Sequence, residues 1–360
     1  MDLPVSTLAR PESFRTTHFS AMDSYRRAQG NMLEWCGFGP NECNYRIILK
    51  GPHWRLREYA GGDGRAAALI VPAPIKRPYI WDLAPSVSVV RHFLDRQFSV
   101  HLIEWMPASD DFSGAGIREY ADHAISECLE RVMDETSGRK PALLGHSLGG
   151  TFAAISCALQ QNVGGLVLLS APLCFQPASS SFRDALVSLL PRRLSESDIV
   201  PGSLLSQMSA FACPRVFVWE KLRNAVLCAL DPSALEIGGR VERWLLDEAP
   251  LPGKLVAEIV QLLYCEDRFC RGALMIGDRI VGPSDIEVPT LAIVDTADQI
   301  APLRSVEPFV AAIASTEARI IEYPGEADVG LQHLALLAGP LAHSRVWPEV
   351  FSWLDAHLEP

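Results

Sequence analysis

Long apolar runs and basic clusters are both missing from this sequence of 360 residues. Prolines Pro72, Pro74 and Pro172 interrupt the most apolar stretches, so none of them predicts a membrane-spanning helix. Residues 1–7 lack the basic and apolar regions of a signal peptide. The net charge is −11, and an acidic chain without basic runs is not typical of a nucleic-acid-binding protein. We therefore expect no membrane span, no nucleic-acid partner and a cytoplasmic location.

Cysteine is present without the spacing that would give it an obvious role. The nine cysteines form no C-x-x-C pair, and neither Cys265 nor Cys270 has a histidine nearby in the sequence. This spacing does not suit a zinc site, so we expect no metal and no cofactor. We interpret the cysteines as reduced, mostly buried thiols of a cytosolic protein.

The stretch 140–151, KPALLGHSLGGT, carries the clearest chemical signal. It predicts a short buried strand, a sharp turn with one serine, and a helix of small and apolar residues. Its centre, Gly145 to Gly149, fits the G-x-S-x-G nucleophile elbow, in which glycines avoid collisions with the neighbouring strand and helix. The turn would place Ser147 at a helix N-terminus, which stabilises a developing oxyanion. An ordinary serine in a glycine-rich turn is the alternative, and the flanking strand and helix favour the elbow.

Strands and helices alternate on both sides of this motif. The continuous apolar run at 66–71 is typical of a buried parallel strand, and segments 100–105, 166–170 and 289–294 are also predicted to be strands. The alternation predicts an α/β-hydrolase fold, with a doubly wound, mostly parallel sheet and an inserted, mainly helical lid. We divide the chain into an N-terminal arm with leading strands (1–60), the first part of the core (61–171), the inserted lid (172–287) and the second part of the core (288–360).

The first of these segments begins with two different patterns. Residues 1–17 look like a loose arm, and the apolar spacing over 20–35 predicts a helix.

An activated serine needs a base, and in this fold the order along the chain is Ser, Asp, His. The histidines that follow Ser147 are His333, His343 and His357. We favour His333, because it follows a strand and a glycine-containing loop and precedes a helix. We interpret His343 and His357 as packing or solvated side chains. His146 is expected to line the substrate pocket rather than act as the base, because adjacent side chains diverge.

The carboxylate that orients the base is expected in the segment 295–302, DTADQIAP. Asp298 stands one step into the loop, where the acid usually lies, and we predict it as the third member of the triad. Asp295, directly at the strand end, is the alternative, and a helix-capping role is its other interpretation.

The oxyanion hole takes one N–H from the residue after the nucleophile, here Leu148, and one from the loop after an earlier strand. That loop reads PAPI over 72–75, and proline has no N–H to donate. Ala73 and Ile75 are therefore the candidates, and we favour Ile75.

Several further motifs occur together between residues 45 and 354. They are the segments 75–85, 88–91, 102–105, 119–120, 149–151, 251–253 and 263–264. A last motif near the C-terminus consists of His333, Gly339 and residues 347–348. Together they resemble the polyhydroxyalkanoate synthases, and most closely the short synthase subunits that work with a second subunit. The resemblance implies an acyl ester or thioester as substrate, with a coenzyme A thioester as a candidate, and a homodimer or a second subunit as partner.

One departure from that family concerns the nucleophile, which is cysteine in the synthases and Ser147 here. A thiol exchanges readily with coenzyme A thioesters, whereas serine forms an oxyester that a second alcohol displaces with more difficulty. We therefore expect a serine hydrolase or acyltransferase, with 3-hydroxyacyl groups as a candidate substrate class. The alternatives are a synthase that uses serine and a non-catalytic, synthase-like subunit.

Overall fold

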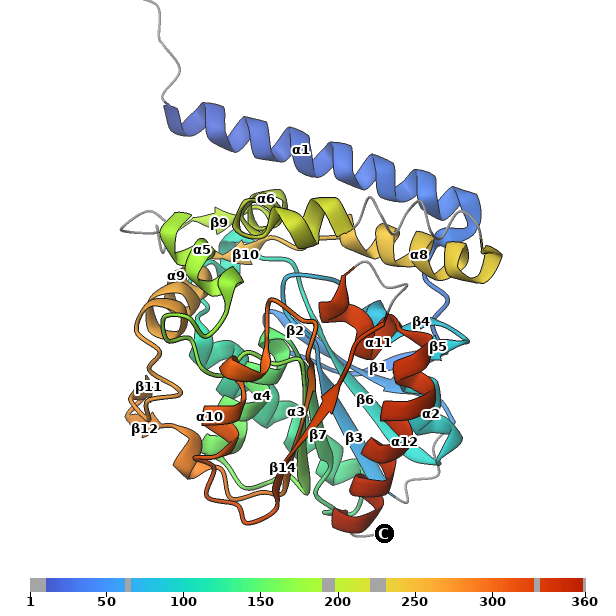
Figure 1. Cartoon of the computed structure of the whole chain (residues 1–360), viewed down its shortest axis with the longest axis vertical. Helices are drawn as coiled ribbons and strands as arrows, with labels where there is room; N and C mark the ends of the chain where they lie inside the picture. The colour runs from blue at the N-terminus through green and yellow to red at the C-terminus, as the bar shows by residue number, and fades with distance from the viewer. Residues whose placement is uncertain (1–10, 62–65, 190–197, 221–230, 327–330, 359–360) are drawn as a thin grey trace, which may run out of the picture.

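The computed structural model describes residues 11–61, 66–189, 198–220, 231–326 and 331–358. At its centre lies a sheet of eight strands. They are β1 (Tyr45–Lys50), β2 (Trp54–Tyr59), β3 (Ala66–Val71), β6 (Phe98–Trp105), β7 (Ala142–His146), β8 (Gly165–Leu169), β13 (Thr290–Asp295) and β14 (Ala318–Tyr323). Their order in the sheet is β1-β2-β6-β3-β7-β8-β13-β14 (Figure 1). Only β1 and β2 run antiparallel to their neighbours, which confirms the predicted doubly wound, mostly parallel sheet.

Helices cover both faces of the sheet because both faces of its central strands are apolar. Along β3, Leu69 belongs to one buried cluster and Ile70 to the other, as the alternation of side chains in a strand requires. The first cluster includes residues of η4 (Arg118–Ala124), α3 (Ile125–Glu135) and α4 (Leu148–Leu159). The second includes residues of α2 (Val89–Asp95), α11 (Ala335–Ala338) and α12 (Pro340–His357).

Between β8 and β13 the chain leaves the sheet, although these two strands pair directly. We call residues 172–287 the insertion. Its longer helices are α5 (Ser181–Leu189), α6 (Gly202–Ala212), α8 (Pro232–Leu245) and α9 (Gly253–Glu258). It also contains two small antiparallel pairs that the sequence pattern does not reveal: β9 (Ile199–Val200) with β10 (Leu251–Pro252), and β11 (Leu274–Ile276) with β12 (Arg279–Val281).

Short elements complete the described chain. They are the strands β4 (Asp82–Ala84) and β5 (Val87–Ser88), the α-helix α10 (Glu307–Val310), the π helices η1 (Glu34–Phe38), η5 (Arg215–Glu220) and η6 (Ile259–Cys265), and the 3-10 helices η2 (Pro78–Trp81), η3 (Asp110–Phe112), η7 (Pro283–Asp285), η8 (Leu303–Ser305) and η9 (Gln332–Leu334). Within the part of the chain that the structure describes, no helix combines the length and the apolarity needed to cross a bilayer.

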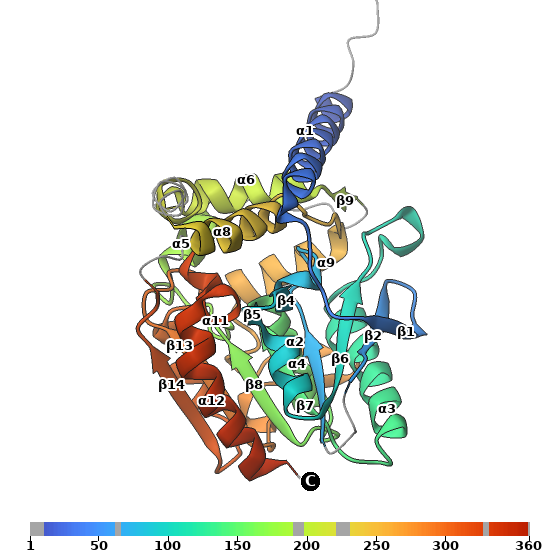
Figure 2. The same cartoon turned by 90° about the vertical axis from the view of Figure 1, so that its right-hand side faces the viewer.

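The first helix, α1 (Pro11–Leu33), begins earlier than the sequence pattern predicts. The prediction of a loose arm over 1–17 is wrong for residues 11–17, and residues 1–10 lie outside the described part of the chain. Proline at the start of a helix is compatible with helical backbone, so Pro11 marks a beginning rather than a break. Both views place α6 and α8 between α1 and the sheet (Figures 1 and 2).

A disulfide joins Cys174, just after β8, to Cys270, near the end of the insertion. The interpretation of all cysteines as reduced thiols is therefore wrong for this pair. Their Cα atoms lie 5.1 Å apart although 96 residues separate them in the sequence. A disulfide needs this spatial approach and not a particular spacing in the chain, so the sequence alone did not indicate it.

Candidate active site

Ser147 lies at the junction where β7 ends and α4 begins. Its backbone has φ 56° and ψ −135°, a region that residues other than glycine rarely occupy and that costs about 1–3 kcal/mol. The turn is also tightly packed: a Cβ atom on Gly145 would lie 2.5 Å from the Gly150 Cα, and one on Gly149 would lie 2.1 Å from the Val71 carbonyl oxygen. The two glycines therefore let strand, helix and the neighbouring loop approach closely around a serine held in strained backbone.

The structure brings Ser147, His333 and Asp298 into one hydrogen-bonded series. His333 Nε2 lies 2.8 Å from Ser147 Oγ, and His333 Nδ1 lies 2.7 Å from Asp298 Oδ2. His333 and Asp298 are buried, whereas Ser147 is partly exposed. A carboxylate at Nδ1 fixes the tautomer in which Nε2 carries a lone pair, and that lone pair can accept the serine proton.

Three separate loops at the carboxyl ends of parallel strands supply these side chains. Ser147 follows β7, Asp298 follows β13, and His333 lies in η9 after β14. Asp298 is held within its own loop, because its Oδ1 accepts the Ile300 N–H at 2.8 Å and its N–H donates to the Asp295 carbonyl at 3.0 Å. The series therefore depends on the sheet order and on one tight turn.

Electrostatics keeps Asp298 ionised. Burial alone would raise the pKa of this carboxyl, but the charge and hydrogen bond of His333, together with the N–H groups of Ile300 and Ala301, hold the pKa below its usual value. An ionised carboxylate is the form that stabilises an imidazolium when His333 takes a proton.

Asp295, the alternative carboxylate, lies at the end of β13 and points elsewhere. Its Oδ1 accepts the Ala297 N–H at 2.8 Å, and its buried Oδ2 has no hydrogen-bond partner. Burial raises the pKa of Asp295 to about 7. The structure therefore places Asp298, and not Asp295, beside His333.

The contacts of His146 in the structure could not be predicted from the residues next to it in the sequence. Its ring is buried, and its Nε2 donates to the backbone carbonyl of His333 at 2.7 Å. Burial, followed by the nearby charge of His333, lowers the pKa of His146 to about 3, so its imidazole is neutral. The side chain of His146 thus contacts both the backbone and the ring of His333, and its expected place in the lining of the substrate pocket stays a prediction.

The candidate oxyanion donors lie where the elbow meets the loop after β3. Leu148 is the first residue of α4, and N–H groups in the first turn of a helix have no acceptor within the helix. In the facing loop, Ala73 and Ile75 are both partly exposed. The Ile75 carbonyl accepts the Ala249 N–H at 2.9 Å, so the insertion holds this residue from its other side.

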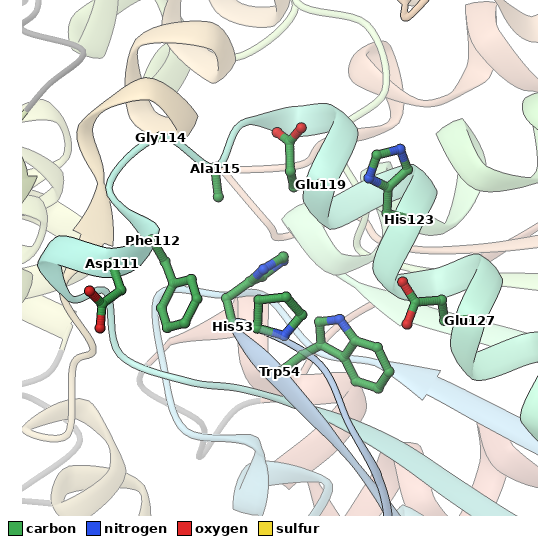
Figure 3. A pocket seen from close by; sticks show the side chains of 10 residues that line it. His53, Trp54, Asp111, Phe112, Gly114, Ala115, Glu119, His123 and Glu127 are labelled. Atoms are coloured by element: carbon green, nitrogen blue, oxygen red, sulfur yellow. The ribbon is translucent and has the colours of Figure 1, made fainter.

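A cavity of about 270 Å³ lies beside the turn between β1 and β2, and sequence reasoning did not identify it. Figure 3 shows the His53 ring between Phe112 on one side and Glu119 and His123 on the other. Neither the triad residues nor the candidate oxyanion donors line this cavity. Among the described residues, no group of three or more His, Cys, Asp or Glu side chains could hold a metal ion.

Comparison with known proteins identifies the family to which this chain belongs. Residues 80–328 match the family described as alpha/beta hydrolase fold. The Poly(3-hydroxyalkanoate) polymerase subunit PhaC of Haloferax mediterranei is 27% identical over 335 residues, which cover 90% of this chain and 65% of that protein. The subunit of the same name from Thiocystis violacea is 24% identical over 329 residues, covering 89% of each chain.

Solved structures agree on the fold. The monoacylglycerol lipase of Paleococcus ferrophilus superposes with a TM-score of 0.51 at 17% identity, covering 85% of this chain and 100% of that one. The chain spans 65% of the length of the Haloferax relative. The lipase structure shares its fold. Since the family match extends over most of the chain, this protein belongs to the α/β-hydrolase fold family and is similar to poly(3-hydroxyalkanoate) polymerase subunits.

Proposed function

We propose that this protein is a serine acyl hydrolase or acyltransferase that forms an acyl-enzyme on Ser147. The observation that carries the proposal is the series of hydrogen bonds from Ser147 through His333 to Asp298, at 2.8 and 2.7 Å. Membership of the α/β-hydrolase fold family supports it, since this fold supplies the same three groups in the same chain order.

In the first half of the reaction, Ser147 Oγ attacks the carbonyl carbon of an ester or thioester while His333 Nε2 takes the hydroxyl proton. Asp298 stabilises the resulting imidazolium through its bond to Nδ1–H. The N–H groups of Leu148 and Ile75 donate to the oxyanion. When the tetrahedral intermediate collapses, the leaving alcohol or thiol receives the proton from His333, and the acyl group remains on Ser147.

In the second half, His333 removes a proton from water or from an acceptor alcohol, which attacks the carbonyl carbon of the acyl-enzyme. The bond between that carbon and Ser147 Oγ then breaks, and His333 returns the proton to Oγ. Water gives the free acid, and an alcohol gives a new ester. Similarity to poly(3-hydroxyalkanoate) polymerase subunits favours a 3-hydroxyacyl group. We propose a coenzyme A thioester as the donor of this group. Serine favours hydrolysis or a single transfer, because its oxyester exchanges less readily than a thioester.

The second candidate is a polymerase that uses Ser147 as its nucleophile. Similarity to the Thiocystis violacea polymerase subunit over 89% of each chain favours it. In that case the acceptor is the hydroxyl of a growing polyester, and the protein works as a homodimer or with a second subunit in the cytoplasm. A non-catalytic, synthase-like subunit is the third candidate.

Product analysis distinguishes these functions. The protein is mixed with 3-hydroxybutyryl-coenzyme A, and released thiol, free acid and insoluble polymer are measured, with Ser147→Ala and Ser147→Cys as matched variants. We expect thiol and free acid from the parent protein and neither from Ser147→Ala. Polymer from the parent would establish the second candidate, and equal thiol release by the parent and Ser147→Ala would refute a serine acyl-enzyme.

A further inference from the structure

Glu248, between α8 and β10 of the insertion, contacts segments that are far apart in the sequence. Its carboxylate, on a side chain that is 3% exposed, accepts hydrogen bonds from Arg26 Nε of α1 at 2.9 Å and from Lys76 Nζ of the loop after β3 at 2.7 Å. The Ser206 hydroxyl of α6 donates to the same carboxylate. One carboxylate therefore connects the N-terminal helix, the insertion and the loop that carries the candidate oxyanion donors.

Backbone contacts strengthen the connection between the insertion and this loop. Lys76 and Glu248 form an isolated antiparallel bridge, and the Ala249 N–H donates to the Ile75 carbonyl at 2.9 Å. The Trp244 indole N–H donates to the Arg77 carbonyl at 2.7 Å. The segment from Ile75 to Arg77 is thus held along its whole length by residues 244–249.

On the outer side, α1 covers this part of the insertion. Arg26 Nη2 also donates to the Leu245 carbonyl at 2.9 Å, and Asp23 Oδ1 accepts the Ser203 N–H at 2.9 Å. Figure 1 shows α1 lying across α6 and α8. The helix α1 therefore contacts the insertion, and Glu248 of the insertion contacts the loop after β3.

We propose that Glu248 is a positioning residue that holds the Ile75 N–H in line with the oxyanion, and that Arg26 of α1 keeps Glu248 in place. This inference rests on the proposed function, because it concerns the donor of that reaction. Removing the carboxylate would leave the Lys76 ammonium, which also donates to the Leu245 carbonyl, without an ion-pair partner. Because an uncompensated buried charge is costly, we expect the loop to move in response. A displaced donor weakens binding of the transition state more than binding of the ground state.

The charge of Lys76 gives a second signature of the same arrangement. Burial, only partly offset by Glu248, lowers the pKa of Lys76 to about 8. The charged groups that face it are Glu248, Arg26 and Asp247. Below pH 8 the ammonium binds Glu248, and above pH 8 the neutral amine binds it more weakly. We therefore expect kcat to fall as the pH rises through about 8 in the parent protein, and not in Lys76→Met.

The test compares Glu248→Gln and Arg26→Gln with Arg27→Gln, a matched control on the same helix whose side chain is exposed. Measurements are kcat and KM with a chromogenic acyl ester, the affinity for a trifluoromethyl ketone that binds as an oxyanion, and the thermal midpoint. We expect both test variants to lower kcat and ketone affinity by the same factor, about 10-fold or more, since one oxyanion donor contributes about 10²–10³ in kcat. KM should change less than 2-fold, and Arg27→Gln should match the parent.

The following outcomes would refute the positioning role of Glu248 or the proposed function. Unchanged kcat and ketone affinity in the folded variants would overturn the positioning role, as would a lower kcat with unchanged ketone affinity. If Glu248→Gln does not fold, Arg26→Gln decides alone, since it removes only the outer partner. A parent protein that a fluorophosphonate does not label at Ser147 refutes the proposed function and this inference together, whereas a labelled parent with unaffected variants refutes this inference only.

Discussion

Replacing Asp298 with asparagine tests the base more sharply than replacing the histidine. The Ile300 N–H donates to Oδ1 at 2.8 Å, so the carbonyl oxygen of the new amide would occupy that position. The amide NH₂ would then face His333 Nδ1, which Oδ2 now contacts at 2.7 Å. An N–H donor at this point forces the imidazole proton onto Nε2, and Nε2 can no longer accept a proton from Ser147.

The expected loss in kcat is about 10⁴-fold, or about 5.4 kcal/mol of transition-state stabilisation, by analogy with the same change in a serine protease. The fold should survive, because the volume and the Ile300 bond are kept. The assay is steady-state hydrolysis of a chromogenic ester together with the rate of fluorophosphonate labelling. Asp295→Asn is the matched control and should lose less than 10-fold, since Asp295 makes no hydrogen bond to His333. The assignment is refuted if Asp298→Asn keeps more than a tenth of the activity, or if both variants lose equally.

Three further changes have distinct readouts. Gly149→Ala would place a Cβ 2.1 Å from the last carbonyl oxygen of β3, so we expect destabilisation by about 1–3 kcal/mol and loss of fluorophosphonate labelling. The control is Gly114→Ala, whose added Cβ would have no atom within 4 Å and which should behave as the parent in a thermal melt. Asp295→Asn should be more stable than the parent at pH 8 and equal to it near pH 4. The folded pKa of Asp295 is about 7 against 3.8 for the free side chain, so the parent loses stability as the pH rises from about 4 to about 7, by at most about 4 kcal/mol. Equal urea midpoints at pH 8 would contradict this. Alkylation of the denatured, unreduced protein should spare Cys174 and Cys270 in the peptide map, and alkylation of both without a reductant would show that the pair is reduced.

The local part of the site followed from the sequence. Strand, turn and helix around Ser147 are contiguous, so their pattern and the two flanking glycines were readable in one short stretch. His333 was favoured because the topology of the fold orders the loops, and the structure places this residue beside Ser147.

The choice of Asp298 over Asp295 as the triad carboxylate had less support in the sequence. Both follow the same strand, and the direction of each carboxylate depends on a turn closed by the bond from the Asp298 N–H to the Asp295 carbonyl. No property of the two side chains by themselves decides which one faces His333.

Contacts between distant segments could not be predicted from local sequence patterns. His146 bonds to the backbone of a residue 187 positions away, and Arg26 bonds to Glu248 across 222 positions. The same is true of the disulfide between Cys174 and Cys270. Such pairs are set by packing of the insertion and of α1 on the core, which hydrophobic periodicity does not encode.

The most direct test of the central claim is a peptide mass map after reaction with a fluorophosphonate, with Ser147→Ala as control. An activated serine predicts one adduct, on the peptide that contains Ser147, and none in the variant. An adduct that persists in Ser147→Ala, or an intact protein that gains no mass while it hydrolyses esters, would contradict the account.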